Sequence, residues 1–170
     1  MRTIPWLMPK SIEFLKSFLA VYPAARVLEF GSGGSTIWFA ERGVKAISIE
    51  HDAAWIAKLE AELKVRGKTA GLRLLPRPYD SVCQEFPDEF FDLVLVDGRD
   101  RVKCVNASMP KVKTNGIIML DNAERPEYRE IYSLLAKWEF FKTTHQGPDE
   151  TGFVYGSPEI WETNWWKKPR

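Results

Sequence analysis

The segment Val27-Leu28-Glu29-Phe30-Gly31-Ser32-Gly33-Gly34-Ser35-Thr36 has the spacing of a ligand-binding loop. An apolar run that ends in glycines and opens a helix is typical of nucleotide-binding turns, where backbone N–H groups at the helix N-terminus face the ligand. Glu29 stands two residues before the first glycine, and the loop contains no Lys or Arg. A carboxylate at this position would repel a pyrophosphate and attract positive charge. The loop therefore predicts a cationic ligand without phosphate.

S-adenosylmethionine (SAM) is such a ligand, because it carries a sulfonium and an ammonium group on an adenosine. The dinucleotide-binding pattern G-x-G-x-x-G also requires a third glycine at the position where this chain has Thr36. Charge and spacing therefore both favour SAM over NAD as the cofactor.

Four acids, Glu29, Glu50, Asp97 and Asp121, stand at or next to the ends of predicted strands, and His145 ends a predicted sixth strand. Ligands bind at the carboxyl ends of the strands in open α/β sheets, so these side chains are expected along one rim. Crowded carboxylates repel one another unless cations intervene. Four acids along one rim are therefore hard to explain by stability alone. The rim is therefore the predicted site, and Glu50 is expected to accept hydrogen bonds from ribose hydroxyls.

Apolar periodicity and the positions of Gly and Pro predict the elements that carry these residues. Helices are predicted over residues 10–22, 35–42, 53–66, 101–112 and 126–138. Strands are predicted over 26–30, 44–50, 72–75, 90–97, 116–121 and 139–145, with a closing antiparallel hairpin over the aromatic stretches 151–155 and 160–166. This alternation predicts an α/β, Rossmann-like, doubly wound and mostly parallel sheet. Residues 1–170 are predicted to form a single domain, with a helical cap over 1–22 and the C-terminal strands over 139–170.

Together, the stretches 28–35, 47–52, 92–98 and 116–122 resemble the class I SAM-dependent methyltransferases, a likeness that covers residues 10–140. The resemblance implies a seven-stranded sheet with a final antiparallel strand. It implies that the first acid and the glycine turn hold the methionine part of SAM: Glu29, Gly31, Ser32, Gly33 and Ser35. It also implies that Glu50 holds the ribose and that the loop after the third strand, with Tyr79 and Asp80, holds the adenine. His51 is expected against the adenine ring or in solvent.

The stretch from Asp92 to Asn122 is also similar to the cation-dependent O-methyltransferases of the catechol type. That resemblance implies a metal site at Asp97, Asp121 and Asn122, whose oxygen ligands suit Mg²⁺. A metal there would lower the pKa of an acceptor hydroxyl and orient it. In an alternative interpretation, Asp97 binds the SAM ammonium and the Asp121-Asn122 pair only caps a turn.

The chain departs from the catechol-type pattern at one position. Those enzymes place a lysine base three residues after the first metal ligand, where this chain has Asp100 between Arg99 and Arg101. Arginine stays protonated and makes a poor base. The remaining candidates for deprotonating an acceptor hydroxyl are the Asp97 and Asp121 pair, with or without metal, and His145.

Bulk properties limit the possible partners. The net charge is +1, whereas nucleic acids and anionic membranes usually call for a basic face, so neither is expected as a partner. Cys83 and Cys104 are too few for a disulfide framework, and no stretch approaches the ~20 apolar residues of a membrane helix. A cytoplasmic protein is predicted.

The acceptor is expected to be a small molecule or a carbohydrate with a hydroxyl group. Arg99, Arg101 and Arg125 are either anion-binding residues at the rim or solvated surface arginines. The tryptophans near the termini either stack on an acceptor or pack a terminal hairpin, where a homodimer interface is one hypothesis. Three functions stay open: a SAM-dependent O-methyltransferase, an NAD-linked oxidoreductase, and a SAM-binding assembly protein without transfer activity.

Overall fold

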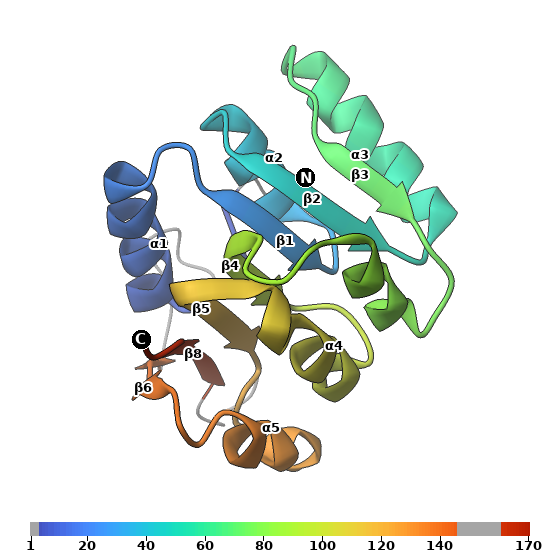
Figure 1. Ribbon diagram of the computed structural model, residues 1–170. Coiled ribbons are helices and arrows are strands. Elements are labelled where there is room, and N and C mark those ends of the chain that lie inside the picture. Colours follow the sequence, from blue (N-terminus) through green and yellow to red (C-terminus); the bar gives the residue numbers. More distant parts are fainter. Residues whose placement is uncertain (1–3, 146–160) are drawn as a thin grey trace.

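The protein is described by a computed structural model that covers residues 4–145 and 161–170. A single sheet lies between two layers of helices (Figure 1). The helices are α1 (Pro9–Val21), α2 (Gly34–Glu41), α3 (Ala53–Val65), α4 (Arg101–Ser108) and α5 (Arg129–Leu134), with short 3-10 helices η1 (Tyr79–Glu85), η2 (Met109–Lys111) and η3 (Pro126–Tyr128). The strands are β1 (Arg26–Phe30), β2 (Lys45–Glu50), β3 (Gly71–Leu74), β4 (Phe91–Val96), β5 (Val112–Asp121), β6 (Glu139–Phe141), β7 (Thr144–His145) and β8 (Trp161–Lys167).

The strands follow the order β3-β2-β1-β4-β5-β8-β6, and the short β7 pairs with β8 beside this row. Strands β1 to β5 pair in parallel, whereas β8 runs antiparallel to both β5 and β6. The predicted doubly wound, mostly parallel sheet with an antiparallel C-terminal part is confirmed. The direction of winding reverses between β1 and β4, and an open α/β sheet binds its ligands in the crevice at such a point.

Alternating side chains of the central strands face two separate cores. Leu28 of β1 and Val94 of β4 pack with Cys104 of α4 on one face. Val27 and Leu93 point to the other face, where α1 and α2 pack. Figure 1 shows α4 and α5 on the side of the sheet opposite α1. Since both faces are covered, the central strands are almost continuously apolar, as the sequence of 91–96 shows.

Several elements differ from their predicted bounds: α5 covers only Arg129–Leu134, and the predicted strand 139–145 is divided into β6 and β7. β5 starts at Val112 rather than at residue 116, and α4 ends at Ser108 rather than at residue 112. Phe91 pairs with Val112 but Leu93 pairs with Ile117, so the intervening residues of β5 form a bulge. Asn115 in this bulge has φ +64°. Bulges of this kind disrupt the apolar alternation on which the prediction depended.

The C-terminal strand β8 pairs antiparallel with its neighbours, and its tryptophans pack on both faces of the sheet. Trp165 stacks on Phe14 of α1 at 4.4 Å between ring centroids and also on Phe141 of β6. Trp166 is buried on the opposite face. These contacts support hairpin packing for both residues, while the predicted strand at 151–155 lies outside the described residues. No helix within 4–145 or 161–170 is both long and apolar enough to cross a lipid bilayer.

Candidate cofactor and acceptor site

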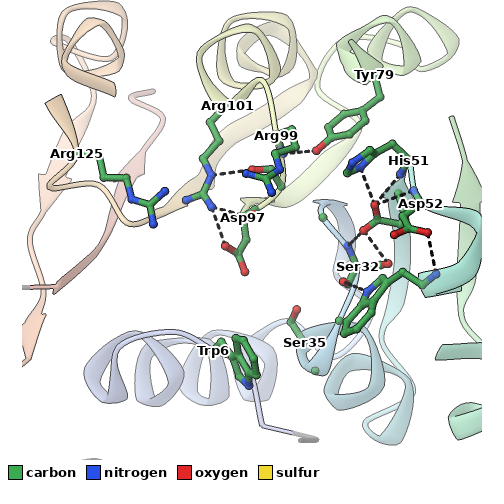
Figure 2. A pocket seen from close by; sticks show the side chains of 16 residues that line it. Trp6, Ser32, Ser35, His51, Asp52, Tyr79, Asp97, Arg99, Arg101 and Arg125 are labelled. Atoms are coloured by element: carbon green, nitrogen blue, oxygen red, sulfur yellow. Dashed lines mark hydrogen bonds and ion pairs between the residues drawn. The ribbon is translucent and has the colours of Figure 1, made fainter. Parts of the chain in front are cut away.

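A cavity of about 520 Å³ opens at the carboxyl ends of β1, β2 and β4, at the point where the winding reverses. Figure 2 shows side chains from the glycine turn, the end of β2, η1 and the loops after β4 and β5 around one space. The cavity therefore lies at the rim that the sequence predicted. Such concave sites, with a few convergent polar groups, are the usual place for a small ligand.

The glycine turn brings β1 and β4 into close contact. Gly31 has φ +94°, a backbone conformation that residues other than glycine rarely adopt. A Cβ on Gly31 would lie 2.6 Å from the backbone of Gly98, which follows β4. The Gly31 N–H donates to the carbonyl of Ile49, and the Asp97 N–H donates to the carbonyl of Phe30. The turn is therefore fixed at the bottom of the cavity with its backbone exposed to a ligand.

Glu50 links the end of β2 to this turn. Its Oε1 accepts hydrogen bonds from the N–H groups of His51 at 2.7 Å and Asp52 at 3.1 Å. Its Oε2 accepts longer bonds of 3.3 Å from the N–H and hydroxyl of Ser32. These bonds hold the carboxylate in one orientation at the cavity wall. Because the Oε2 bonds are long, that oxygen has capacity for a ligand hydroxyl.

Asp52 and Trp55 complete the same wall. Asp52 caps α3 by accepting from the N–H groups of Ala54 and Trp55, as its position before a helix suggests. The indole N–H of Trp55 donates to the carbonyl of Ser32 at 2.8 Å. Trp55 thereby ties α3 to the glycine turn, although it belongs to no motif in the sequence.

The short helix η1 places Tyr79 and Asp80 differently. Tyr79 is almost fully buried, lines the cavity, and its hydroxyl accepts a hydrogen bond from the N–H of Arg99. Asp80 is not among the described residues that line the cavity. Its Oδ1 is buried, and its charge acts on the thiols of Cys83 and Cys104 instead. Asp80 is half-buried beside the cavity lining, and its contact with adenine stays a prediction.

Glu29 lies behind the glycine turn rather than in the cavity. It is fully buried and is absent from the described lining residues. Its Oε2 accepts hydrogen bonds from Thr36 at 2.6 Å and Ser48 at 2.5 Å, which join α2 and β2 to β1. Burial raises the pKa of Glu29 to about 7. Its Oε1 is buried and has no hydrogen-bond partner among the described residues, so the direct cofactor contact of Glu29 stays a prediction, while its Oε2 bonds hold the elements around the turn together.

The raised pKa predicts a pH-dependent stability. Between pH 4.5 and about 7 the folded protein retains a proton on Glu29 that the unfolded chain releases, so stability falls as pH rises through this window. We expect Glu29→Gln, which cannot ionise, to gain stability over the natural protein as the pH rises from 5 to 8, by up to about 3 kcal/mol. Urea unfolding at pH 5, 6, 7 and 8 measures this gain. Equal pH slopes for both proteins would contradict it, and Glu60→Gln on the exposed face of α3 is the control.

Asp97, Asp121 and Arg101 form a compact charged group beyond the turn. Arg101 is buried and directs its guanidinium at the ends of β4 and β5. It donates to the carbonyls of Gly98 at 2.9 Å, Asp97 at 2.8 Å and Asp121, and to Oδ1 of Asp97 at 3.1 Å. Figure 2 shows the Asp97 carboxylate directed into the cavity below Arg101. Asp97 is therefore the acid of this group that a ligand can reach.

Asp121 lies behind Asp97. It is buried, is not among the described lining residues, and accepts a hydrogen bond from the Thr163 hydroxyl of β8 at 2.6 Å. Burial raises the pKa of both carboxyls, the charge of Asp97 raises that of Asp121 further, and Arg101 lowers both. A direct contact of Asp121 with substrate, as predicted, is not supported by this position. The carboxyls of Asp121 and Asp97 act on each other's pKa, and a catalytic role for Asp121 stays a prediction.

No protein-family model matches the chain, and no curated protein is detectably similar to it in sequence. Solved structures are similar in fold. A Staphylococcus aureus protein assigned to the caffeoyl-CoA O-methyltransferases matches at 14% identity over 96% of this chain and 86% of its own, with a TM-score of 0.67. A SAM-dependent methyltransferase from Methanosarcina mazei matches at 15% identity over 96% of this chain and 98% of its own, with a TM-score of 0.64.

The chain has the class I SAM-dependent methyltransferase fold. The same fold occurs in spermidine synthase from Thermotoga maritima, at 20% identity over 86% of this chain and 54% of that protein, with a TM-score of 0.58. One methyltransferase-like scaffold thus serves different reactions, so the reaction must be argued from the site.

In this methyltransferase fold, the residues present do not suit the predicted metal site. The guanidinium of Arg101 already binds the oxygens of Asp97 and the carbonyl of Asp121, and a divalent cation beside it would be repelled. One of the two carboxylate oxygens of Asp121, Oδ1, already accepts a hydrogen bond from Thr163. Across the described part of the chain, no group of three or more His, Cys, Asp or Glu side chains is arranged to hold a metal ion. Mg²⁺ coordination by Asp97, Asp121 and Asn122 is therefore not supported.

The remaining predicted residues either line the cavity or stay untested. Gly31, Ser32, Gly33, Ser35, Glu50, His51, Tyr79 and Asp97 line one cavity, as the methyltransferase resemblance implied. The backbone of His145 pairs with Trp161 in the short strand β7, and a catalytic role for it stays a prediction. Gly98, the last residue of the motif stretch 92–98, and Trp6, one of the tryptophans near the termini, also line the cavity. The sequence signal that was available for Arg101 is its position four residues after Asp97, which places Arg101 at the first position of α4, within reach of Asp97 at the end of β4.

Proposed function

We propose that the protein is a SAM-dependent methyltransferase. The observation that carries the proposal is the separation of charge along the cavity. At one end the described lining contains Glu50 and Asp52, whereas Arg101 and Arg125 lie at the opposite end with Asp97, and Arg99 lies between the two ends beside Tyr79. A sulfonium and an ammonium group are favoured at the acidic end, and a pyrophosphate is disfavoured there.

The residues at the acidic end match the parts of SAM. The backbone of the turn at Gly31 and Gly33 would approach the methionine part, and the Oε2 of Glu50 would accept from a ribose hydroxyl. Tyr79 and His51, whose rings lie 6.1 Å apart, would flank the adenine. When bound, SAM supplies an activated methyl group.

An oxygen of a small hydroxylated metabolite or glycan precursor is the proposed acceptor. Asp97 is the carboxylate that reaches the cavity, so it would accept the hydroxyl proton as the oxygen forms its bond to the methyl carbon. Burial favours the protonated form of Asp97, and Arg101 offsets part of this effect, which suits a base that works near neutral pH. Most of the rate would come from aligning the oxygen with the methyl group.

The alternatives are an NAD-linked oxidoreductase and a SAM-binding protein without transfer activity. Isothermal titration with S-adenosylhomocysteine (SAH), SAM and NAD distinguishes the proposed function from the oxidoreductase. The proposal expects both SAM and SAH to bind and NAD to give no saturable heat. Tighter binding of NAD than of SAH would overturn it. Transfer of a labelled methyl group from SAM to an acceptor, with SAH released, separates the second.

Cation independence follows from the place of Arg101. We expect the Kd for SAH and the rate of methyl transfer to differ by less than about twofold between an assay with about 5 mM EDTA and one with about 5 mM Mg²⁺. The reason is that the Arg101 guanidinium already supplies positive charge between the ends of β4 and β5. Activity that is lost in EDTA and restored by Mg²⁺ would show that the acids rearrange to hold a metal.

A further inference from the structure

The arginines that line the cavity differ in how many of their hydrogen-bond donors are already occupied. Four hydrogen bonds from Arg101 to the ends of β4 and β5 leave it little capacity for a ligand. Among the described residues, the one ion pair of Arg125 is a distant one with Glu124, at 3.9 Å. Its backbone is fixed by a turn in which its N–H donates to Asn122 and its carbonyl accepts from Tyr128. Arg125 is therefore a positioned cation with unused donors.

Arg99 is in the same situation. Its backbone is held at both sides, because its N–H donates to the Tyr79 hydroxyl and its carbonyl accepts from the Cys104 thiol. The acid next to it, Asp100, is already paired with Arg77 through bonds of 2.8 and 3.0 Å. The side chain of Arg99 is exposed and lines the cavity. Arg99 and Arg125 thus line the cavity without a hydrogen-bonded carboxylate partner among the described residues, and the charge of Arg125 acts on Asp97.

These cations lie beside the proposed base and an aromatic wall. Figure 2 shows Arg125 and Asp97 directed toward the same space, with the indole of Trp6 across from them. Trp6 is 56% exposed, which is unusual for so large an apolar side chain beside a cavity. A planar ring or sugar face can lie against an indole, and arginine donors match the paired oxygens of a carboxylate or phosphate.

We propose that the acceptor is an anion, and that Arg99 and Arg125 bind its carboxylate or phosphate group while its hydroxyl lies at Asp97. This proposal rests on the proposed methyltransferase function for the role of Asp97, but the anion site itself does not require it. The acceptor class is then a hydroxylated carboxylic acid or a hydroxylated phosphate ester, and its neutral analogues are excluded by the loss of two charge-assisted contacts.

The test titrates inorganic phosphate and, separately, benzoate onto the protein with and without SAH at constant ionic strength. The Nε–H signals of the arginines are followed by ¹⁵N–¹H NMR. We expect saturable shifts of the Arg99 and Arg125 signals with at least one of the two anions. Tighter phosphate binding indicates a phosphate ester, and tighter benzoate binding indicates a carboxylic acid. We expect affinity to fall about tenfold in Arg125→Gln or Arg99→Gln and saturation to be lost in the double variant.

Arg129→Gln, an equal loss of charge on exposed α5 and away from the cavity, is the matched control and should keep the full affinity. Shifts that do not saturate with either anion, or an unchanged affinity in the double variant, would overturn the anion site. SAH titration of the same samples separates the two proposals. Protein that binds SAH but neither anion refutes only the acceptor class, and protein that binds an anion but not SAH refutes only the methyltransferase.

Discussion

Replacing Gly31 by alanine is expected to lower the free energy of unfolding by about 3 kcal/mol and the melting temperature by roughly 10 °C. The added Cβ would lie 2.6 Å from the Cα and the N of Gly98, in backbone that pairs β1 with β4 and cannot move like a flexible side chain. The φ of +94° adds a cost that only glycine avoids. Urea denaturation followed by circular dichroism measures the loss.

Gly33→Ala is the matched control for this substitution. Gly33 belongs to the same turn, but its backbone is extended at φ 176°, and no atom lies within 4 Å of an added Cβ. We expect its unfolding free energy to stay within about 0.5 kcal/mol of the natural protein, the range of substitutions that touch no structural feature. If both alanine variants lose the same stability, the close approach of Gly31 to Gly98 is not what constrains the turn.

Loss of SAH affinity by about 100-fold is the result expected for Glu50→Ala. The variant removes a carboxylate that is already oriented by the N–H groups of His51 and Asp52, and with it a hydrogen bond between a charged group and the ribose. A hydrogen bond to a charged group contributes up to about 3 kcal/mol, which corresponds to roughly two orders of magnitude in Kd. Isothermal titration with SAH gives the Kd directly and requires no acceptor.

Two comparisons make the Glu50 result specific. Glu60→Ala removes an acid from the exposed face of α3 and should leave the SAH affinity unchanged. Glu50→Gln keeps the shape and should retain more affinity than Glu50→Ala, since one oxygen can still accept. Folding of each variant is checked by its melting temperature. A Glu50→Ala protein that folds and binds SAH as tightly as the natural protein would remove Glu50 from the site.

Much of the fold and the core of the site could be predicted from sequence, because their signals are local. Glycines at 31 and 33, the acid Glu50 at the end of β2 and the apolar run of β4 each carry their meaning in a few neighbouring residues. The rule that ligands bind at the carboxyl ends of parallel strands then brought these residues to one rim. The structure places Gly31, Glu50 and Asp97 around one cavity.

The remainder depends on contacts between distant parts of the chain. Charge alone cannot show that Glu29 lies behind its turn, since Ser48 and Thr36 bind it there from β2 and α2. The same limit applies to Arg101, whose acceptor at Asp121 is 20 residues away. The bulge at Asn115 changed the bounds of β5 through its pairing with β4. Trp6 precedes every motif and lines the cavity only because of how the chain enters α1.

A crystal structure of the protein soaked with SAH and NAD together would decide most directly whether the acidic end of the cavity selects a positively charged cofactor. We predict density for SAH, with its ribose at Glu50 and its amino acid part over the turn at Gly31. A dinucleotide with its pyrophosphate at that turn would contradict the proposed function.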